Sequence, residues 1–284
     1  WSSDVCSSDL QFIANGDVGG LANFLNTSNA FGNGNGGALR NGGLPENFIT
    51  VNPQYGSVNL AGNNTNSTYH SLQTTLSQRY ARGFSGQFSY VWSKNLGDTG
   101  LRDPRNRSML SKGVLGNNRT HIVKATGTWD LPFGSKGYIG RNAKGWLDKT
   151  IGGWQLAPVV QWASGAPLSF TSAIGTAGFR AGNTADMVGQ IQKGTVRKDP
   201  TNFVEYFTGL TTKTAPVPNY GADQATLAGR LTNFVVVDAS GNTIFQNPTP
   251  GRTGNTATFL PGIDGPAQLG FDLSLSKKIQ LTET

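Results

Sequence analysis

Histidine is the side chain that most often moves protons or binds metals near neutral pH, and this chain has only two, His70 and His121. Neither one stands in the H-E-x-x-H pattern of zinc peptidases or near a G-x-S-x-G nucleophile turn. The acidic residues form no pair whose spacing suggests acid–base catalysis. We therefore expect no catalytic residue, no metal site and no cofactor, and we expect that the protein is not an enzyme.

A glycine-rich stretch offers one nucleotide-binding pattern, because Gly32, Gly34 and Gly37 match G-x-G-x-x-G. That pattern binds a dinucleotide only when it follows a strand and opens a helix in a βαβ unit. No strand pattern precedes Gly32, and 39 glycines in 284 residues make a chance match common. We interpret the match as compositional.

Four charged residues remain as candidates for ligand contacts, namely Arg79, Lys124, Asp130 and Asp272. Each one stands in a segment where polar and apolar residues alternate, so in a strand it would point to the polar side of the sheet. On the inner wall of a pore, such a charge can contact a solute or tune its passage. The alternative is a hydrated wall residue without a specific role.

The segments that carry these charges alternate with a period of two, which is typical of strands with one apolar face. Between Phe84 and Trp92 the aromatic residues occupy even positions, and serine and glutamine occupy odd ones, with Val91 as the exception. The short connection 81–83 predicts a hairpin. Pro158 cannot donate to a strand ladder and predicts a bulge or an edge strand. The alternating runs are 69–80, 84–93, 122–133, 154–163 and 269–279.

Composition also favours an all-β fold, because the chain is rich in Gly, Asn, Ser and Thr and only 14% of its residues are charged. No run approaches the roughly 18 apolar residues of a membrane helix. A barrel strand, however, presents only every second residue to the bilayer. Alternation alone therefore fits both a soluble β-sandwich and a membrane β-barrel.

Three features favour the barrel. The runs approach the roughly 9 to 11 residues that cross a bilayer, short and long loops alternate along the chain, and aromatic residues lie near the ends of the runs. We predict a partial antiparallel transmembrane β-barrel, which in this chain is an open curved sheet with long loops. His70 and His121 are also expected near an interface. The aromatic residues expected at the membrane interfaces are Tyr80, Phe84, Trp92, Trp129, Phe133, Trp154 and Trp162.

Residues 1–10 contain Ser-Ser-Asp twice and resemble a translated sequencing adapter, so we expect them to be an artefact. They include Cys6, the only cysteine, and without Asp4 and Asp9 the formal charge rises from +7 to +9. Lys and Arg are spread along the chain and never form a long run. We therefore expect no nucleic-acid partner.

The remaining chain divides into four predicted segments. Short strands are expected at 48–51 and 57–60, and a short helix is expected near 202–207 or 223–231. The segments are a loop-rich part with short strands at 11–68, barrel strands at 69–172, a long external loop region at 173–266 and a truncated barrel strand at 267–284.

A series of short motifs covers about residues 52–172, in the order Asn52–Ser57, Asn66–Gln73, Phe88–Lys94, Asp103–Asn106, Arg119–His121, Trp129–Gly134, Gly152–Leu156 and Ser164–Leu168. With the final strand, this ordered series resembles TonB-dependent outer-membrane receptors of the Oar-like type, which are abundant in acidobacteria. Each motif is weakly specific alone, and the series is fairly specific.

The resemblance implies a transporter barrel of about 22 strands with a plug in its lumen. It also implies energy supplied from the inner membrane through the TonB complex. The plug and a carboxypeptidase-regulatory-like domain would precede this chain and further strands would follow it, so we expect an internal fragment of the barrel. The implied partners are the lipid bilayer, the TonB complex through the absent parent region and an unknown small solute, in the bacterial outer membrane.

Two functional hypotheses follow. The first is a barrel segment of a TonB-dependent receptor that takes up an unidentified solute, with the plug and the TonB-contact region absent. The alternative is a secreted β-sandwich or surface adhesion domain that binds carbohydrate through exposed Trp and Tyr. They differ in what covers the apolar faces, which is lipid in the first case and protein in the second.

Overall fold

The computed structural model describes residues 3–27, 34–52, 55, 63, 65–98, 112–135, 137–176, 183–191, 194–198, 204–216 and 227–279. The chain folds into two compact units. The first, here called the sheet unit, comprises residues 68–95, 117–166 and 264–284. The second, here called the loop unit, comprises residues 1–67, 96–116 and 167–263.

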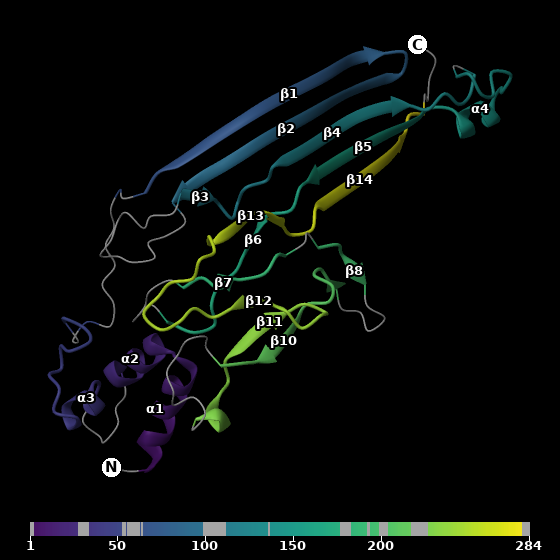
Figure 1. The fold of residues 1–284 in the computed structure, drawn as a ribbon. Helices are drawn as coiled ribbons and strands as arrows, with labels where there is room; N and C mark the ends of the chain where they lie inside the picture. Colours follow the sequence, from purple (N-terminus) through teal and green to yellow (C-terminus); the bar gives the residue numbers. More distant parts are fainter. Residues whose placement is uncertain are drawn as a thin grey trace. The chain divides into compact units, whose positions relative to one another are not determined.

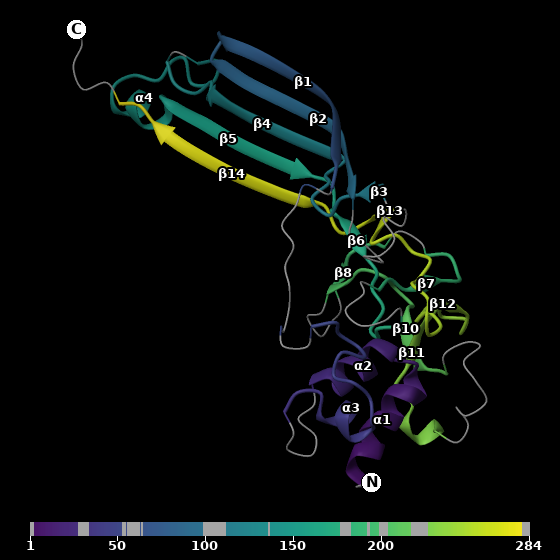
Figure 2. The same cartoon turned by 90° about the vertical axis from the view of Figure 1, so that its left-hand side faces the viewer.

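The sheet unit is built on long strands in the order β1-β2-β4-β5-β14, which lie side by side in Figures 1 and 2. Pairing is antiparallel from β2 through β14, and β1 and β14 are the two ends of this order, so the sheet is open. The prediction of an all-β, antiparallel open sheet is confirmed. The strands are β1 Ser67–Ala81, β2 Phe84–Asp98, β4 His121–Asp130, β5 Trp154–Ala163 and β14 Gln268–Lys277, with the short β3 Lys112–Val114 paired to the end of β2.

The strand register aligns the apolar residues of successive strands on one side of the sheet. Phe84 lies opposite Trp129, Trp129 opposite Leu156, and Leu156 opposite Leu275. We call this side the apolar face and the other side the polar face. Large side chains of the apolar face remain exposed, from Phe84 on β2 to Leu275 on β14, so no other part of the described chain covers them.

The hairpin between β1 and β2 turns at Arg82 and Gly83, which have φ angles of 53° and 83°. Two successive positive φ angles are typical of a type I′ turn, whose twist matches that of the flanking strands. The predicted tight hairpin is therefore confirmed. Glycine adopts the second position without strain, because it has no Cβ.

Pro158 does not mark a bulge or an edge strand, so that prediction is wrong. Strand β5 lies between β4 and β14, and its register with β14 is continuous through the pair Pro158 and Leu273. A residue in an antiparallel strand directs its N–H to only one neighbour. In the register between β4 and β5, Gly127 and Thr128 have no paired residue. This gap lies beside Pro158, so the interior strand tolerates the missing N–H of proline there.

A glycine pair on β2 and β4, near the hairpin end of the sheet, is covered by an aromatic ring. Gly86 lies opposite Gly127, and a Cβ on Gly86 would come within 3.0 Å of the Phe84 ring. The Phe84 ring thus occupies the space that side chains at the pair would fill. Covering strand glycines with an aromatic side chain compensates for their missing apolar contacts.

The N-terminal part of the loop unit is helical. It forms α1 Ser3–Asn15, α2 Val18–Thr27 and α3 Gly37–Asn41. The predicted short strand at 48–51 is absent from the structure, and the one at 57–60 lies outside the described residues. Frequent Asn and Gly indicated loop, whereas tertiary contacts such as the ring contact of Phe12 with Phe24 hold the helices. No described helix is long and apolar enough to cross a membrane.

The segment predicted as a long loop at 173–266 contains several short strands. Four of them form a sheet in the order β10-β11-β12-β7, and β13 pairs with β6. The predicted short helix corresponds to one 3-10 turn, η4 Ala228–Arg230, and 204–205 is strand. The short strands of this segment are β7 Asp186–Met187, β8 Arg197–Lys198, β9 Val204–Glu205, β10 Thr211–Thr214, β11 Phe234–Val237, β12 Thr243–Gln246 and β13 Phe259–Asp264, and β6 Pro167–Ser169 precedes it.

The loop unit has a small apolar core and a buried polar network. Phe245 of the core stacks on Phe170 with ring centroids 4.7 Å apart. Next to this core, Asn233 accepts a hydrogen bond from Asn247, and its backbone N–H donates to Asn15. All three asparagines are buried, so amide side chains join segments that are far apart in the sequence.

One close backbone approach gives a testable stability prediction. A Cβ on Gly165 would lie 1.7 Å from the carbonyl oxygen of Gly265, whose N–H donates to Ala166 at 2.8 Å. We expect Gly165→Ala to lower the free energy of unfolding by about 2 kcal/mol, because the backbones must separate. Denaturant titration of the full chain in detergent measures this change.

Gly270→Ala is the matched control, because its added Cβ would meet its nearest atom only at 3.9 Å. The same Gly→Ala change there should leave the free energy of unfolding within about 0.5 kcal/mol of the parent value. Equal effects of the two substitutions would contradict the close approach at Gly165.

Candidate functional site

The four charged candidates lie on strands of the sheet but do not form one cluster. Lys124 lies opposite Ser89 on one side and Gln161 on the other, and Asp272 lies opposite Val159. Both positions belong to the polar face. Arg79 stands on β1 close to the Arg82 turn. Their contact with a solute stays a prediction.

Asp130 is the candidate whose side chain accepts hydrogen bonds from two other side chains. It accepts a hydrogen bond from the side-chain amide of Gln155 at 2.7 Å and one from the Tyr80 hydroxyl. Asp130 and Gln155 are paired across β4 and β5. Tyr80, expected among the interface aromatics, thus directs its hydroxyl to a residue of the polar face.

The other expected interface aromatics occupy two levels of the sheet. Phe84, Trp129 and Trp154 stand at or next to the strand ends near the tight hairpin. Trp92 and Trp162 lie toward the opposite ends, where Trp92 faces His121. Phe133 lies outside the strands and forms an isolated bridge with Ile139. Within the sheet, the Lys277 ammonium lies 4.6 Å from the Trp154 ring centroid. Their membrane role stays a prediction.

The two histidines have separate surroundings. His70 lies exposed in β1, whereas His121 begins β4 and its Nδ1 lies 2.9 Å from the Tyr90 hydroxyl. The backbone of His121 also exchanges hydrogen bonds with Ser164. Two motifs of the sequence series therefore meet at this end of the sheet. No group of three or more potential metal ligands occurs within the described ranges.

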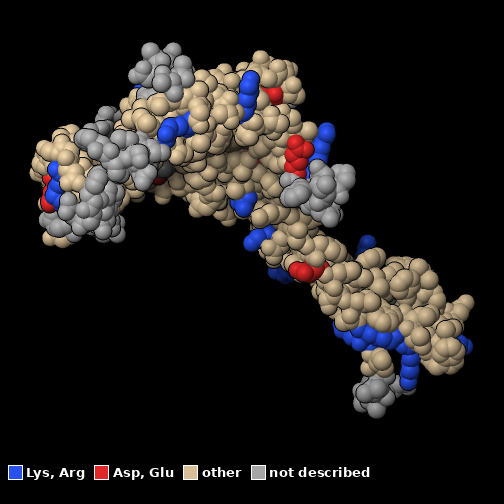
Figure 3. All heavy atoms as spheres, turned by 90° about the horizontal axis from the view of Figure 1, so that it is seen from below, with Lys and Arg blue, Asp and Glu red and all other residues tan. Residues whose placement is uncertain are grey.

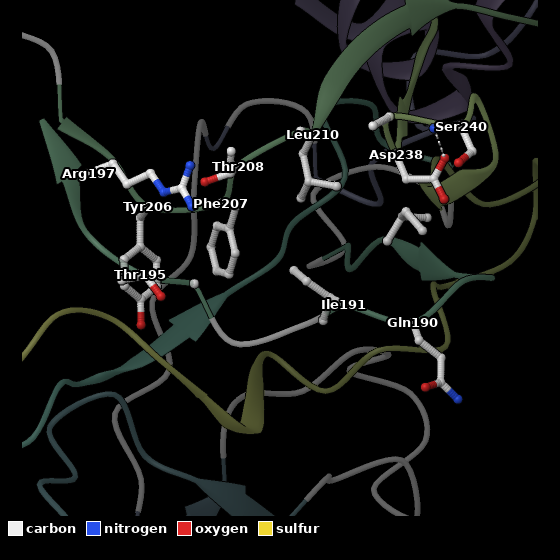
Figure 4. Close-up of a pocket in the computed structure, with 14 residues that line it drawn as sticks. Gln190, Ile191, Thr195, Arg197, Tyr206, Phe207, Thr208, Leu210, Asp238 and Ser240 are labelled. Carbon is white, nitrogen blue, oxygen red and sulfur yellow. Dashed lines mark hydrogen bonds between the residues drawn. The ribbon is translucent and has the colours of Figure 1, made fainter. Parts of the chain in front are cut away.

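A pocket of about 450 Å³ lies in the loop unit, and sequence reasoning missed it. Figure 4 shows Arg197, Tyr206 and Thr208 on one side and Asp238 with Ser240 on the other. The residues come from 190–191, 194–197, 206–210 and 238–244, which are separate in the sequence. Its volume is in the range of small-molecule sites. We take it as a candidate binding site in the described part of the chain.

One wall of the pocket depends on a close backbone contact. A Cβ on Gly194 would lie 2.0 Å from the carbonyl oxygen of Tyr206, so only glycine allows this approach. Tyr206 and Phe207 meet edge to face with ring centroids 4.8 Å apart. The adjacent aromatic pair was the one sequence signal for a site in this otherwise polar stretch.

The Asp238 carboxylate closes the turn between β11 and β12. Its Oδ1 accepts hydrogen bonds from the backbone N–H groups of Ser240 at 2.9 Å and Asn242 at 2.8 Å, and its Oδ2 accepts one from the Asn242 side chain at 3.1 Å. These hydrogen bonds, with the Asn242 side chain contributing most, hold the pKa of Asp238 below its ordinary value. The carboxylate therefore stays ionised at neutral pH.

The lowered pKa predicts how the turn responds to acid. A depressed carboxyl pKa stabilises the folded turn fully above the unfolded pKa of about 3.9, and this contribution is lost as pH falls through the lower folded value. We expect the backbone amide resonance of Asn242, followed by NMR on the full chain in detergent, to titrate with a midpoint below about 3.9. Asp238→Asn should abolish the titration, and a midpoint above the ordinary value would contradict the hydrogen-bonding account.

Charge is sparse outside these sites. On the face drawn in Figure 3, most of the described surface is uncharged, and acidic side chains are visible there at only a few places. This agrees with a chain in which 14% of residues are charged.

Comparison with family models gives one match, to a family described as outer membrane beta barrel domain, over residues 17–284. The match includes all five long strands of the sheet unit and most of the loop unit. The comparisons with curated proteins and with solved structures find no match.

Proposed function

From the premise that this chain belongs to the outer membrane beta barrel domain family and lies in the bacterial outer membrane, we propose that it forms part of the wall of a TonB-dependent receptor that takes up a small solute. The observation that carries this proposal is the apolar face, whose large side chains are exposed along the sheet from Phe84 to Leu275. Exposure of such an apolar surface to water is unfavourable in free energy, whereas contact with lipid tails is not.

The two faces of the sheet then have different partners. The apolar face contacts the bilayer, and the polar face, with Lys124, Asp130 and Asp272, lines the interior of the barrel. The short hairpin at Arg82 belongs to the periplasmic side, because barrels of this kind have short periplasmic turns. The long segments that join the opposite ends of the strands then lie outside the cell and contact the solute.

The TonB-dependent part of the proposal is supported by the ordered motif series. Two of its motifs, around Arg119 and Ser164, meet in the fold through a 3.1 Å hydrogen bond from Arg119 to the Ser164 carbonyl. The role is uptake and not catalysis, with a plug that gates the barrel and energy that comes through the TonB complex.

Fractionation of cells that express the chain with an outer-membrane signal sequence tests the membrane part. We expect the protein to stay with the outer membrane during an alkaline wash and to require detergent for extraction. A monomer that is soluble in plain buffer and unfolds in one cooperative thermal transition would contradict the proposal. That result would favour the secreted adhesion domain instead.

Sequencing the genomic locus upstream of the codon for Gln11 tests the TonB-dependent part. We expect the same reading frame to encode a plug and a TonB-contact segment. A continuous upstream frame without these two elements would contradict the receptor assignment while leaving the barrel intact.

A further inference from the structure

We propose that the pocket of the loop unit binds a short peptide as a zwitterion, with the peptide ammonium at Asp238 and its carboxylate at Arg197. This inference names a solute class for the external loops and so rests on the proposed uptake function. It is carried by two opposite charges at separate ends of one pocket with apolar side chains between them.

The cationic end of the pocket is the Arg197 side chain on β8. Figure 4 shows its guanidinium extending toward Thr208. Glu205 is the cross-strand neighbour of Arg197, but among the described residues the one salt bridge is between Arg40 and Glu46. The guanidinium is thus available to an incoming carboxylate, which its planar donors can bind with two parallel hydrogen bonds.

The anionic end is the Asp238 carboxylate, which its turn fixes in place. Both oxygens accept hydrogen bonds from Ser240 and Asn242, so the group is already ordered before a ligand arrives. An ionised carboxylate has about four acceptor positions, and the turn uses three donors. The remaining capacity can accept an N–H of a ligand ammonium.

The middle of the pocket is apolar with polar groups at its margin. Ile191 and Leu210 lie between the charged ends in Figure 4. Ile244 also lines the pocket, and Gln190 and Thr195 add an amide and a hydroxyl to the lining. This arrangement matches a peptide, whose termini are charged, whose side chains are often apolar and whose backbone needs hydrogen bonds. A neutral sugar would leave both pocket charges without a partner.

Isothermal titration of the full chain in detergent with the tripeptide Ala-Leu-Ala tests the proposal. We expect binding, and we expect N-acetylation or C-amidation of the peptide to weaken it about tenfold each, as loss of one charge-assisted contact predicts. Asp238→Asn should remove the penalty of acetylation, and Arg197→Gln should remove the penalty of amidation. Lys213→Gln, an exposed change on β10 outside the pocket lining, should leave all affinities unchanged.

Equal binding of free and capped tripeptides, binding of maltotriose with no binding of the tripeptide, or no binding at all would each overturn the assignment. Thermal unfolding of each variant checks that the pocket is intact, and Arg197→Gln serves if Asp238→Asn disrupts its turn. The membrane fractionation is independent of these titrations. A membrane-embedded chain that ignores the peptide overturns only this inference, and a soluble chain that binds it overturns only the proposed uptake function.

Discussion

Leu273→Arg is expected to lower the free energy of unfolding of the bilayer-embedded protein by about 2 to 4 kcal/mol, the cost of an arginine at the lipid-facing midplane of a membrane barrel. Leu273 lies in the middle of β14, opposite Pro158 on the apolar face. Its side chain is 53% exposed, so packing against protein does not account for such a loss. Urea unfolding of the chain in lipid vesicles measures the effect.

Ser274→Arg is the matched control on the neighbouring residue. Ser274 pairs with Ala157 and points to the polar face, where water or a polar lumen can hydrate the charge. We expect a change below about 1 kcal/mol there. Similar losses for both substitutions would mean that the two faces meet the same surroundings, which would contradict a membrane wall. A large loss at Ser274 alone would reverse the assignment of the faces.

The faces of the sheet could be predicted from sequence because alternation with a period of two is a property of each strand alone and does not depend on the order of the strands. Each alternating run predicted one apolar and one polar side, and the register of the strands aligns Phe84, Trp129 and Leu275 on the same side. Pro158 was misjudged for a physical reason, since the cost of a missing N–H depends on which neighbour it faces. That neighbour is a property of the register and is invisible in a single run.

The loop unit could not be predicted in the same way. Its strands are as short as the two residues of β7, Asp186–Met187, too few to establish a period. Its pocket joins Arg197 to Asp238, and nothing in the local sequence relates the two. Its buried asparagines could not be predicted from composition either, because asparagine usually indicates an exposed turn. Asn233 is nevertheless only 2% exposed.

Asn233→Ala is expected to destabilise the loop unit by about 3 kcal/mol, because the buried Asn247 amide and the half-buried Ala215 carbonyl both lose their hydrogen bond to this side chain. The Asn233 side chain donates to the Ala215 carbonyl at 2.8 Å and accepts from the Asn247 amide at 2.6 Å. Hydrogen exchange on the full chain should show faster opening of β10 to β12 and unchanged protection in β4 and β5. Asn47→Ala, at an exposed asparagine of the same unit, should change neither.

A charged substitution at the same position separates hydrogen bonding from packing. Asn233→Asp keeps the shape of the side chain, but its ionised form would direct a carboxylate oxygen at the Ala215 carbonyl in place of the amide donor. Burial raises the pKa of such a carboxyl, and the neutral acid can again donate to that carbonyl. This stabilisation is fully present below the unfolded pKa of about 3.9 and is lost as pH rises through the raised folded pKa. Protection of β10 to β12 in this variant should therefore increase on acidification within the range where the parent protein stays constant. A pH-independent loss would mean that Asn233 acts through its volume alone, and the amide network would then not be what holds these segments together.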